Sequence, residues 1–257
     1  MRCSQSASLL NGNYAGPKSR VRTVRQSSGF LQVNVMLDVR AAFVPNQLEI
    51  EQEALGGGLK RGFDIVVASL ILVVLAPFFV MLTILIKMTD PGPIIYQHSR
   101  VGYQGKQFSC VKFRTMVVDS ESRLRTLLDA DPAAREEWEL HRKLKSDPRI
   151  TPLGSLLRNS SADELPQLIN VIRGDMSLVG PRPVVSEELE HYGEHAKLYL
   201  ATRPGMTGSW QINGRSDVPY ESRVALDADY VRDWCLSTDL LILIRTVGAV
   251  IRQRGSM

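Results

Sequence analysis

The sequence predicts a mainly helical α+β protein with one short β-hairpin, joined to a single long apolar helix. Residues 65–86 contain no formal charge over 22 positions. Two short strand-like segments flank a turn at residues 100–106, and most other segments show the apolar spacing of helices. A chain of 257 residues is long enough for one domain with appendages.

Residues 1–57 differ in composition from the rest of the chain. They are rich in Ser, Gln, Asn and Gly, and they lack an apolar run suited to a secretory signal. This composition predicts a disordered tail, with Gly56, Gly57 and Gly58 as a flexible joint.

Residues 58–89 form the predicted membrane helix. As a straight helix, its uncharged run would be about 33 Å long, enough to cross the hydrocarbon core. Pro77 lies inside the run and removes a backbone hydrogen bond, which predicts a bend. Lys60 and Arg61 precede the run and Lys87 follows it, so basic residues do not assign its ends to opposite sides. The residues alone leave a spanning and a re-entrant helix equally open.

A hairpin is predicted after this helix, with strands at residues 94–97 and 108–113. The turn at residues 100–106 is no P-loop, because only two residues separate its glycines. Lys112 and Arg114 alternate with apolar residues, which places both cations on one side of the second strand. A solvated strand face would explain this pattern as well.

Three further helical segments are expected. Residues 120–145 are charged and helical in pattern, with a break at Asp131-Pro132, and are predicted to be scaffold. Residues 186–200 are predicted to form one amphipathic helix. Residues 239–254 have a broad apolar face, which either lies in a membrane interface or packs against the domain.

Asp163 and Glu164 stand where another apolar-periodic helix begins. Ser161 and Glu164 match a capping box, which is the ordinary explanation for acids at such a position. Pro166 argues against Ser161 as the N-cap, because it would then occupy the fifth helical position. With Asp163 as the N-cap, Pro166 falls in the tolerated first turn. The two carboxylates could then point differently, one toward a metal and the other toward a reacting group.

Arg182 lies between two prolines in Gly180-Pro181-Arg182-Pro183. The prolines favour an extended, rigid backbone, which lowers the entropy cost of presenting one guanidinium. Such an arginine suits a phosphate, although a solvated surface turn has the same composition. The glycine-rich segment 203–215 could likewise bring its backbone and Trp210 close to a ligand, or bury the indole in a turn.

The net charge and the content of cysteine and histidine exclude fewer functions than the residues described above. The net charge of +4 allows anionic lipid, nucleic acid or a phosphate-bearing substrate. The three cysteines are scattered, which favours a reducing compartment over a disulfide framework. His191 and His195 stand four residues apart, but a solvated helix face explains them better than a metal site.

Three motifs in fixed order carry a family resemblance. They are Lys112-Phe113-Arg114-Thr115-Met116, the block from Arg158 to Pro183, and Arg203-Pro204-Gly205-Met206-Thr207-Gly208. The chain from about residue 60 to its end resembles the bacterial monotopic phosphoglycosyl transferases. The resemblance implies a catalytic domain at residues 90–257, on the cytoplasmic face of the bacterial inner membrane. It also implies a re-entrant membrane helix, with interfacial amphipathic helices. The family's usual Ser-Pro break is Ala76-Pro77 here.

The resemblance further implies a reaction. The enzyme would transfer a sugar 1-phosphate from a UDP-sugar to undecaprenyl phosphate, which starts exopolysaccharide assembly. Galactose follows from likeness to transferases that start succinoglycan-type polymers, and glucose or an acetamido sugar remains open. The implied partners are UDP-sugar, undecaprenyl phosphate and membrane lipids, without nucleic acid, and a homodimer is left open.

The resemblance assigns roles to the residues of the motifs. Asp163 would be the nucleophile and Glu164 the Mg²⁺ ligand. Arg158, Arg182 and Lys112 would offset phosphate charge. Four residues would contact the substrates: Arg114, Arg203, Trp210 and Arg215. A non-catalytic, membrane-anchored basic protein and a membrane-bound phosphohydrolase are the alternatives to this function.

Overall fold

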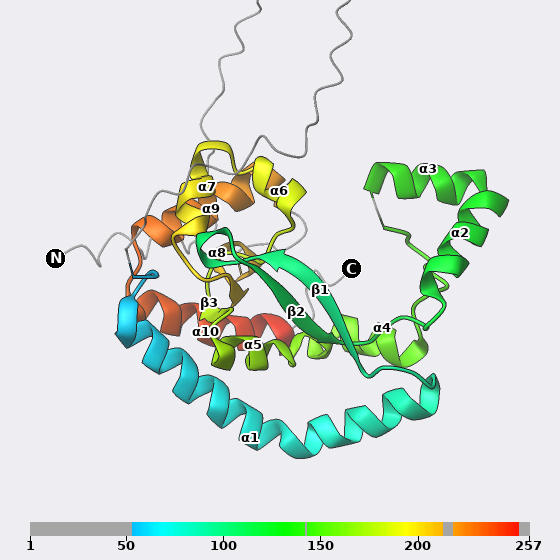
Figure 1. The fold of residues 1–257 in the computed structure, drawn as a ribbon, viewed down its shortest axis with the longest axis horizontal. Helices are drawn as coiled ribbons and strands as arrows, with labels where there is room; N and C mark the ends of the chain where they lie inside the picture. The colour runs from blue at the N-terminus through cyan, green and yellow to red at the C-terminus, as the bar shows by residue number, and fades with distance from the viewer. Residues whose placement is uncertain (1–52, 142, 213–217, 252–257) are drawn as a thin grey trace, which may run out of the picture.

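A computed structural model describes residues 53–141, 143–212 and 218–251 (Figure 1). The α-helices are α1 (Gly57–Thr89), α2 (Ser120–Ala130), α3 (Pro132–His141), α4 (Pro152–Asn159), α5 (Gln167–Arg173), α6 (Ser186–Glu190), α7 (Ala196–Leu200), α8 (Ser209–Ile212), α9 (Tyr220–Arg232) and α10 (Leu236–Ile251). Single 3-10 turns are η3 (Tyr103–Gly105), η4 (Ala162–Glu164) and η5 (Gly193–His195). The strands are β1 (Ile95–Val101), β2 (Gln107–Phe113), β3 (Ser177–Val179) and β4 (Gly205–Thr207). The predicted mainly helical α+β class is confirmed.

The sequence predicted one of the two strand pairs. β1 and β2 form the predicted antiparallel hairpin, in which Tyr96 is opposite Lys112. β3 and β4 form a short parallel pair that the sequence patterns did not predict. The apolar residues before Gly180 therefore make a buried strand, and this strand leads directly into the segment that carries Arg182.

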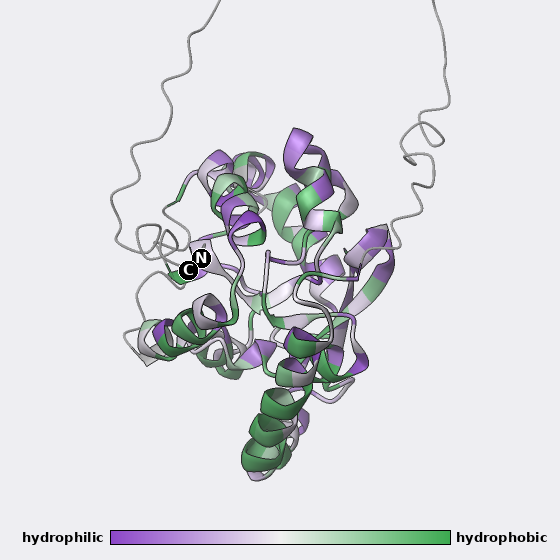
Figure 2. Cartoon of the chain, turned by 90° about the vertical axis from the view of Figure 1, so that its left-hand side faces the viewer, coloured by the Kyte–Doolittle hydropathy of each residue, from purple (hydrophilic) through white to green (hydrophobic). Residues whose placement is uncertain are grey.

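The long helix α1 runs beneath the rest of the domain and bends midway (Figure 1). Pro77 lies inside it, as predicted. One side of the helix packs against the domain through Ala68, Leu82 and Ile86. The opposite side leaves large apolar residues exposed, and Figure 2 shows the green helix projecting from the lower side. By length and composition α1 could cross a membrane.

The predicted flexible joint is an ordered turn. Gly56 has φ +79° and precedes α1, and a Cβ at this position would meet the side chains of Lys60 and Trp234. Ala54 is buried, and the Leu55 N–H donates to the Ala201 carbonyl at 3.3 Å. The last residues of the predicted tail are therefore packed, while residues 1–52 lie outside the described part.

A buried cluster of polar residues joins the start of α1 to the domain. We define the base cluster as Lys60, Asp64, Tyr230, Trp234 and Asp239. The Lys60 ammonium lies 2.5 Å from the Asp239 carboxylate. Asp239 also accepts hydrogen bonds from the Tyr230 hydroxyl at 2.7 Å and the Trp234 indole at 3.1 Å. Asp64 accepts from the backbone N–H of Leu178, in β3, at 3.1 Å.

Arg61 makes a second connection from α1 to the domain. Its guanidinium donates to the carbonyls of Val171 and Ile172, at 2.5 and 2.7 Å, in the last turn of α5. The basic pair before the apolar run therefore binds protein groups. Its position in the sequence carries correspondingly less information about membrane topology.

The predicted helix at residues 186–200 is interrupted, which corrects that expectation. It consists of α6, η5 and α7, and Gly193 between them has φ +49°. The predicted break within residues 120–145 is confirmed, because α2 ends at Ala130 and α3 begins at Pro132. The helical part ends at His141, and Glu121 and Lys143 line the cleft described below, so this segment is more than scaffold. This helical pair stands to one side of the domain (Figure 1).

Candidate active site

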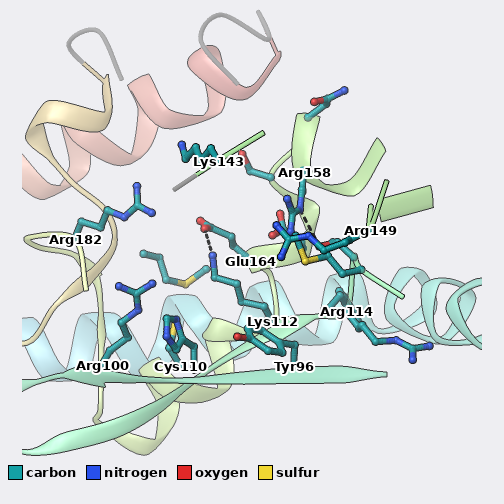
Figure 3. A pocket seen from close by; sticks show the side chains of 18 of the residues that line it. Tyr96, Arg100, Cys110, Lys112, Arg114, Lys143, Arg149, Arg158, Glu164 and Arg182 are labelled. Carbon is teal, nitrogen blue, oxygen red and sulfur yellow. Dashed lines mark hydrogen bonds and ion pairs between the residues drawn. The ribbon is translucent and has the colours of Figure 1, made fainter. Parts of the chain in front are cut away.

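An open cleft of about 1170 Å³ lies between the β-hairpin, η4 and the segments that follow β3 and β4. Figure 3 shows basic side chains converging on it from several elements. Among the described residues, eight basic and three acidic side chains line the cleft. The basic residues are Arg100, Lys112, Arg114, Lys143, Arg149, Arg158, Arg182 and Arg223, and the acids are Glu121, Asp163 and Glu164. This excess of positive charge suits a substrate with several phosphate oxygens.

Asp163 and Glu164 lie in η4, a single 3-10 turn. Ser161 precedes this turn in the left-handed region at φ 57°, and its side chain makes no capping hydrogen bond. Pro166 is the N-cap of the following helix, α5. The predictions of Ser161 or Asp163 as the helix N-cap are therefore both wrong. Ser161 separates the acids from α4, and Pro166 separates them from α5, so both carboxylates belong to a turn at the cleft.

Glu164 and Lys112 form an ion pair across the cleft floor. Their Oε1 and Nζ atoms are 2.6 Å apart, and the side chains of Lys112 and Glu164 are 27% and 33% exposed. The dashed line in Figure 3 joins this pair. β2 therefore places the predicted lysine beside the acidic turn, and the ammonium holds one Glu164 oxygen.

Asp163 is half-buried and has an unusual environment. Burial, followed by the negative charge of Glu164, raises its pKa to about 6. The positive charges of Lys112 and Arg158 oppose this shift. At neutral pH the carboxyl group is therefore mainly ionised, yet it is less solvated than a surface aspartate.

Arg158 reaches the cleft from the last turn of α4. Thr151 caps the start of this helix by accepting from the Gly154 N–H at 2.9 Å. The Arg158 Nε atom donates to the Thr115 hydroxyl at 2.9 Å. Within residues 53–141, 143–212 and 218–251, no carboxylate lies within ion-pair distance of this guanidinium.

Arg182 is exposed in the cleft while its neighbours are fixed on both sides. The Gly180 N–H donates to the Thr207 carbonyl at 2.9 Å, and the Pro181 carbonyl accepts from Gly205 at 2.8 Å. After the second proline, the Val184 carbonyl accepts a hydrogen bond from the Val101 N–H at 2.9 Å, in an antiparallel bridge. For Arg182, too, the described part of the chain offers no carboxylate at ion-pair distance. Backbone hydrogen bonds thus hold the chain on both sides of Arg182, and its presentation to a phosphate stays a prediction.

Two other arginines of the cleft already have acidic partners. Arg114 donates to the Asp90 backbone carbonyl and lies 3.4 Å from its carboxylate. Arg149 pairs with Asp147 at 2.6 Å. The Arg114 guanidinium is thus directed to the end of α1 and not alongside Lys112, as Figure 3 also shows.

The other three residues predicted to contact the substrates differ in their position relative to the cleft. Trp210 lines the cleft, although the residue is buried. Arg203 does not line it, since its Nε atom donates to the Gly174 carbonyl at 2.9 Å at the end of α5. Arg203 therefore supports α5 in this geometry. Arg215 lies outside the described residues.

The sequence patterns missed Arg100, Arg149 and Arg223 as lining residues. Arg100 lies on β1, 3.7 Å from Glu188. Arg223 belongs to α9, and its guanidinium lies 4.8 Å from the centre of the Trp210 ring. The one available signal was alternation along β1, which puts Arg100 on the same strand face as Tyr96 and His98.

The donor set for a divalent metal is small. The described residues contain no group of three His, Cys, Asp or Glu side chains that could hold a metal ion by themselves. Mg²⁺ usually takes one or two carboxylates and completes its shell with substrate phosphates and water. Glu164 beside Asp163 fits this limited requirement, with Lys112 as the competing cation. His191 and His195 belong to no such group of three within the described residues.

Comparison with known proteins identifies the family. The model of the bacterial sugar transferase family matches residues 56–253. The chain belongs to the bacterial sugar transferases. The match includes α1, the hairpin, the acidic turn and both segments that flank the cleft. The family prediction is confirmed, and the cleft belongs to an enzyme of this family.

The relatives of this sugar transferase fall into two size classes. It is 50% identical to the exopolysaccharide production protein ExoY of Sinorhizobium fredii over 84% of this chain and 95% of the relative. It is 53% identical to the undecaprenyl-phosphate galactose phosphotransferase of Salmonella typhimurium, over 77% of this chain but 41% of the relative. It is 37% identical to the UDP-glucose:undecaprenyl-phosphate glucose-1-phosphate transferase of Escherichia coli, over 74% of this chain and 39% of the relative.

Proposed function

We propose that this sugar transferase moves a sugar 1-phosphate from a UDP-sugar to undecaprenyl phosphate, and so starts exopolysaccharide assembly. The observation that carries the proposal is the half-buried Asp163 in a cleft that Arg158 and Arg182 also line, two arginines without a carboxylate partner among the described residues. A cleft with such unpaired guanidinium groups is prepared for a phosphate-rich ligand. The names of the relatives support the nucleotide sugar and the lipid carrier. Galactose is the proposed sugar because two relatives at 50% identity or more carry galactose names.

In the proposed first step, Asp163 attacks the phosphorus that carries the sugar. A bond forms between this phosphorus and the aspartate oxygen, while the bond to the bridging oxygen of UMP breaks. UMP leaves with that oxygen and the electron pair. Arg158, Arg182 and Lys112 surround the cleft with positive charge, which offsets the charge on the leaving group and on the transferring phosphoryl.

In the proposed second step, undecaprenyl phosphate attacks the same phosphorus. Its phosphate oxygen forms the new bond as the aspartyl–phosphorus bond breaks, which frees Asp163. The product is a polyprenyl diphosphate sugar. The bend at Pro77 and the apolar outer side of α1 support a re-entrant helix that holds the cleft at the cytoplasmic face of the inner membrane.

A bound Mg²⁺ would neutralise part of the diphosphate charge and stabilise the departing oxygen. Glu164 is the proposed protein ligand, with substrate phosphates supplying further oxygens. In the structure, the Nζ atom of Lys112 lies 2.6 Å from Oε1 of this carboxylate.

Mass spectrometry tests the proposal directly. The purified chain is incubated with UDP-galactose and Mg²⁺ without a lipid acceptor, and the mass of a hexose phosphate is expected on Asp163. No adduct with several UDP-sugars, despite transfer once undecaprenyl phosphate is added, would indicate direct attack by the lipid phosphate. Release of free sugar phosphate to water in the presence of the lipid would instead identify a phosphohydrolase.

Asp163→Asn is expected to abolish both the adduct and turnover, because an amide cannot serve as the nucleophile. The matched control is Asp129→Asn on α2, which removes an exposed carboxylate that does not line the cleft. The control variant should transfer sugar phosphate at the wild-type rate. Full activity of folded Asp163→Asn would defeat the covalent assignment.

A further inference from the structure

The side chain of Arg158 is anchored by Thr115, a residue to which the proposed reaction assigns no role. The Arg158 Nε atom donates to the Thr115 hydroxyl at 2.9 Å. Thr115 follows β2, whereas Arg158 lies in the last turn of α4, 43 residues later in the sequence. Both residues line the cleft. Tertiary packing therefore joins the hairpin to the guanidinium of a predicted phosphate-binding arginine.

The position of Thr115 is itself fixed, and the residue is only 7% exposed. Its carbonyl accepts from the backbone N–H of Thr151, the N-cap of α4, at 3.1 Å. A Cβ at Gly154 would collide with the same carbonyl oxygen, so the first turn of α4 packs directly against Thr115. Both ends of α4 thus contact this residue, the first turn through its backbone and the last turn through its hydroxyl.

The anchor is neutral, which distinguishes Arg158 from two other arginines of the cleft. Arg114 lies 3.4 Å from the Asp90 carboxylate, and Arg149 lies 2.6 Å from the Asp147 carboxylate. In those two pairs, a negative charge offsets the guanidinium. A hydroxyl group orients a guanidinium without neutralising it. Arg158 is therefore held in place while its charge stays available to an anionic ligand.

The part of the guanidinium left open is its outer fork. Nε carries one of the five N–H donors of arginine, and the two Nη atoms carry the other four. Among the described residues, the Nη atoms have no hydrogen-bond acceptor. Two such amino groups side by side can bind two oxygens of one phosphate. The charge of Arg158 also acts on Asp163, whose raised pKa it opposes, so the fork lies within electrostatic reach of this carboxylate.

We propose that Thr115 is a positioning residue that directs the Arg158 fork toward a phosphate group of the substrate. The inference rests on the proposed function, because Thr115 acts through an arginine of the same cleft. Holding Nε before the substrate arrives removes side-chain freedom that binding would otherwise have to remove. A small misplacement of a group that contacts the transition state costs a large factor in rate. Loss of the hydroxyl should therefore impair transfer although the charge of Arg158 remains.

The test compares Thr115→Val and Thr115→Ser in the purified full chain, with a UDP-sugar that the wild-type chain uses. Valine has nearly the shape of threonine but cannot accept from Nε, whereas serine keeps the hydroxyl. Thr115→Val is expected to lower kcat/KM by about tenfold or more, the loss expected for a hydrogen bond to a charged group. Thr115→Ser should keep most of the activity.

The matched control is Thr126→Val on α2. Thr126 is exposed and does not line the cleft, and its hydroxyl donates to the Ser122 carbonyl of its own helix at 3.0 Å. This variant should transfer sugar phosphate at the wild-type rate.

A double-mutant cycle with Arg158→Ala separates positioning from a merely structural role. If Thr115 acts through Arg158, the valine change should lower kcat/KM no further in the Arg158→Ala background. Equal losses with and without Arg158 would overturn the inference. Wild-type kcat/KM in a folded Thr115→Val variant, or a loss in Thr115→Ser as large as that in Thr115→Val, would overturn it as well.

A wild-type chain that transfers no sugar phosphate would disprove the proposed function, and equilibrium binding of UDP would then decide the inference. Weaker UDP binding in Thr115→Val, with no further weakening in the Arg158→Ala background, would support the positioning role. UDP affinity unchanged by Thr115→Val, or a wild-type chain that binds no UDP, would overturn it.

Discussion

The base cluster and the cleft both contain half-buried or buried charges, but they satisfy them differently. In the base cluster, Asp239 receives an ammonium, a hydroxyl and an indole N–H. In the cleft, Arg158 and Arg182 lack carboxylate partners among the described residues, and Asp163 has a raised pKa. The paired charges of the base cluster fix how α1 attaches to the domain. The arginines of the cleft that have no carboxylate partner among the described residues remain available for a substrate. The three predictions below test this difference, from the largest expected effect to the smallest.

Lys60→Met is expected to destabilise the fold by about 3–5 kcal/mol, because it leaves the buried Asp239 carboxylate without its cation. The measurement is the free energy of unfolding in detergent. Lys87→Met, at the exposed other end of α1, is the control and should change this energy by less than about 0.5 kcal/mol. The double variant Lys60→Met with Asp239→Asn should recover much of the loss, and a stable single variant would contradict the assigned role.

Arg182→Ala is expected to lower kcat by about 10²–10³-fold with little change in Tm, because its guanidinium has no ion pair with any described residue to lose. Arg149→Ala is the contrasting variant, since this arginine pairs with Asp147 and lies over Trp138. The second change should lower Tm more than the first. Steady-state kinetics and thermal unfolding check both variants. A larger loss of Tm in Arg182→Ala than in Arg149→Ala would contradict the distinction between paired and unpaired arginines.

Asp163→Asn is expected to stabilise the folded chain at pH 7 by about 1 kcal/mol, allowing for solvent screening. The folded pKa of about 6 lies above the ordinary value of 3.8, so ionisation of Asp163 opposes folding as pH rises through this window. The advantage of the variant should therefore shrink as pH falls from 6 toward 4. Unfolding free energies at several pH values measure it, and a variant less stable than wild type at pH 7 would contradict the shift.

Local patterns predicted those parts of the fold that depend on neighbours in the sequence. The hairpin and the helix break at Pro132 follow from turn and helix chemistry. The N-cap prediction at Asp163 was wrong because Ser161 adopts a left-handed conformation that leaves the acids in a separate 3-10 turn. Nothing in the sequence around Ser161 signalled that conformation.

The cleft was only partly predictable for a different reason. Asp163, Glu164, Lys112, Arg158 and Arg182 come from motifs that resemble the family, and the structure brings them to one cleft. Pairing between distant residues has no local signature. The contact of Arg114 with Asp90, of Arg203 with Gly174 and of Arg223 with Trp210 therefore became visible only in three dimensions.

The contact of Arg61 with the last turn of α5 has a mechanical consequence. The acidic turn directly precedes α5, a helix of seven residues or about 10 Å, and Arg61 holds its far end. This short strut couples the reacting carboxylate to α1. If α1 rests in the bilayer as proposed, the depth of this helix in the lipid sets the height of Asp163 above the acyl chains, through Arg61 together with the base cluster.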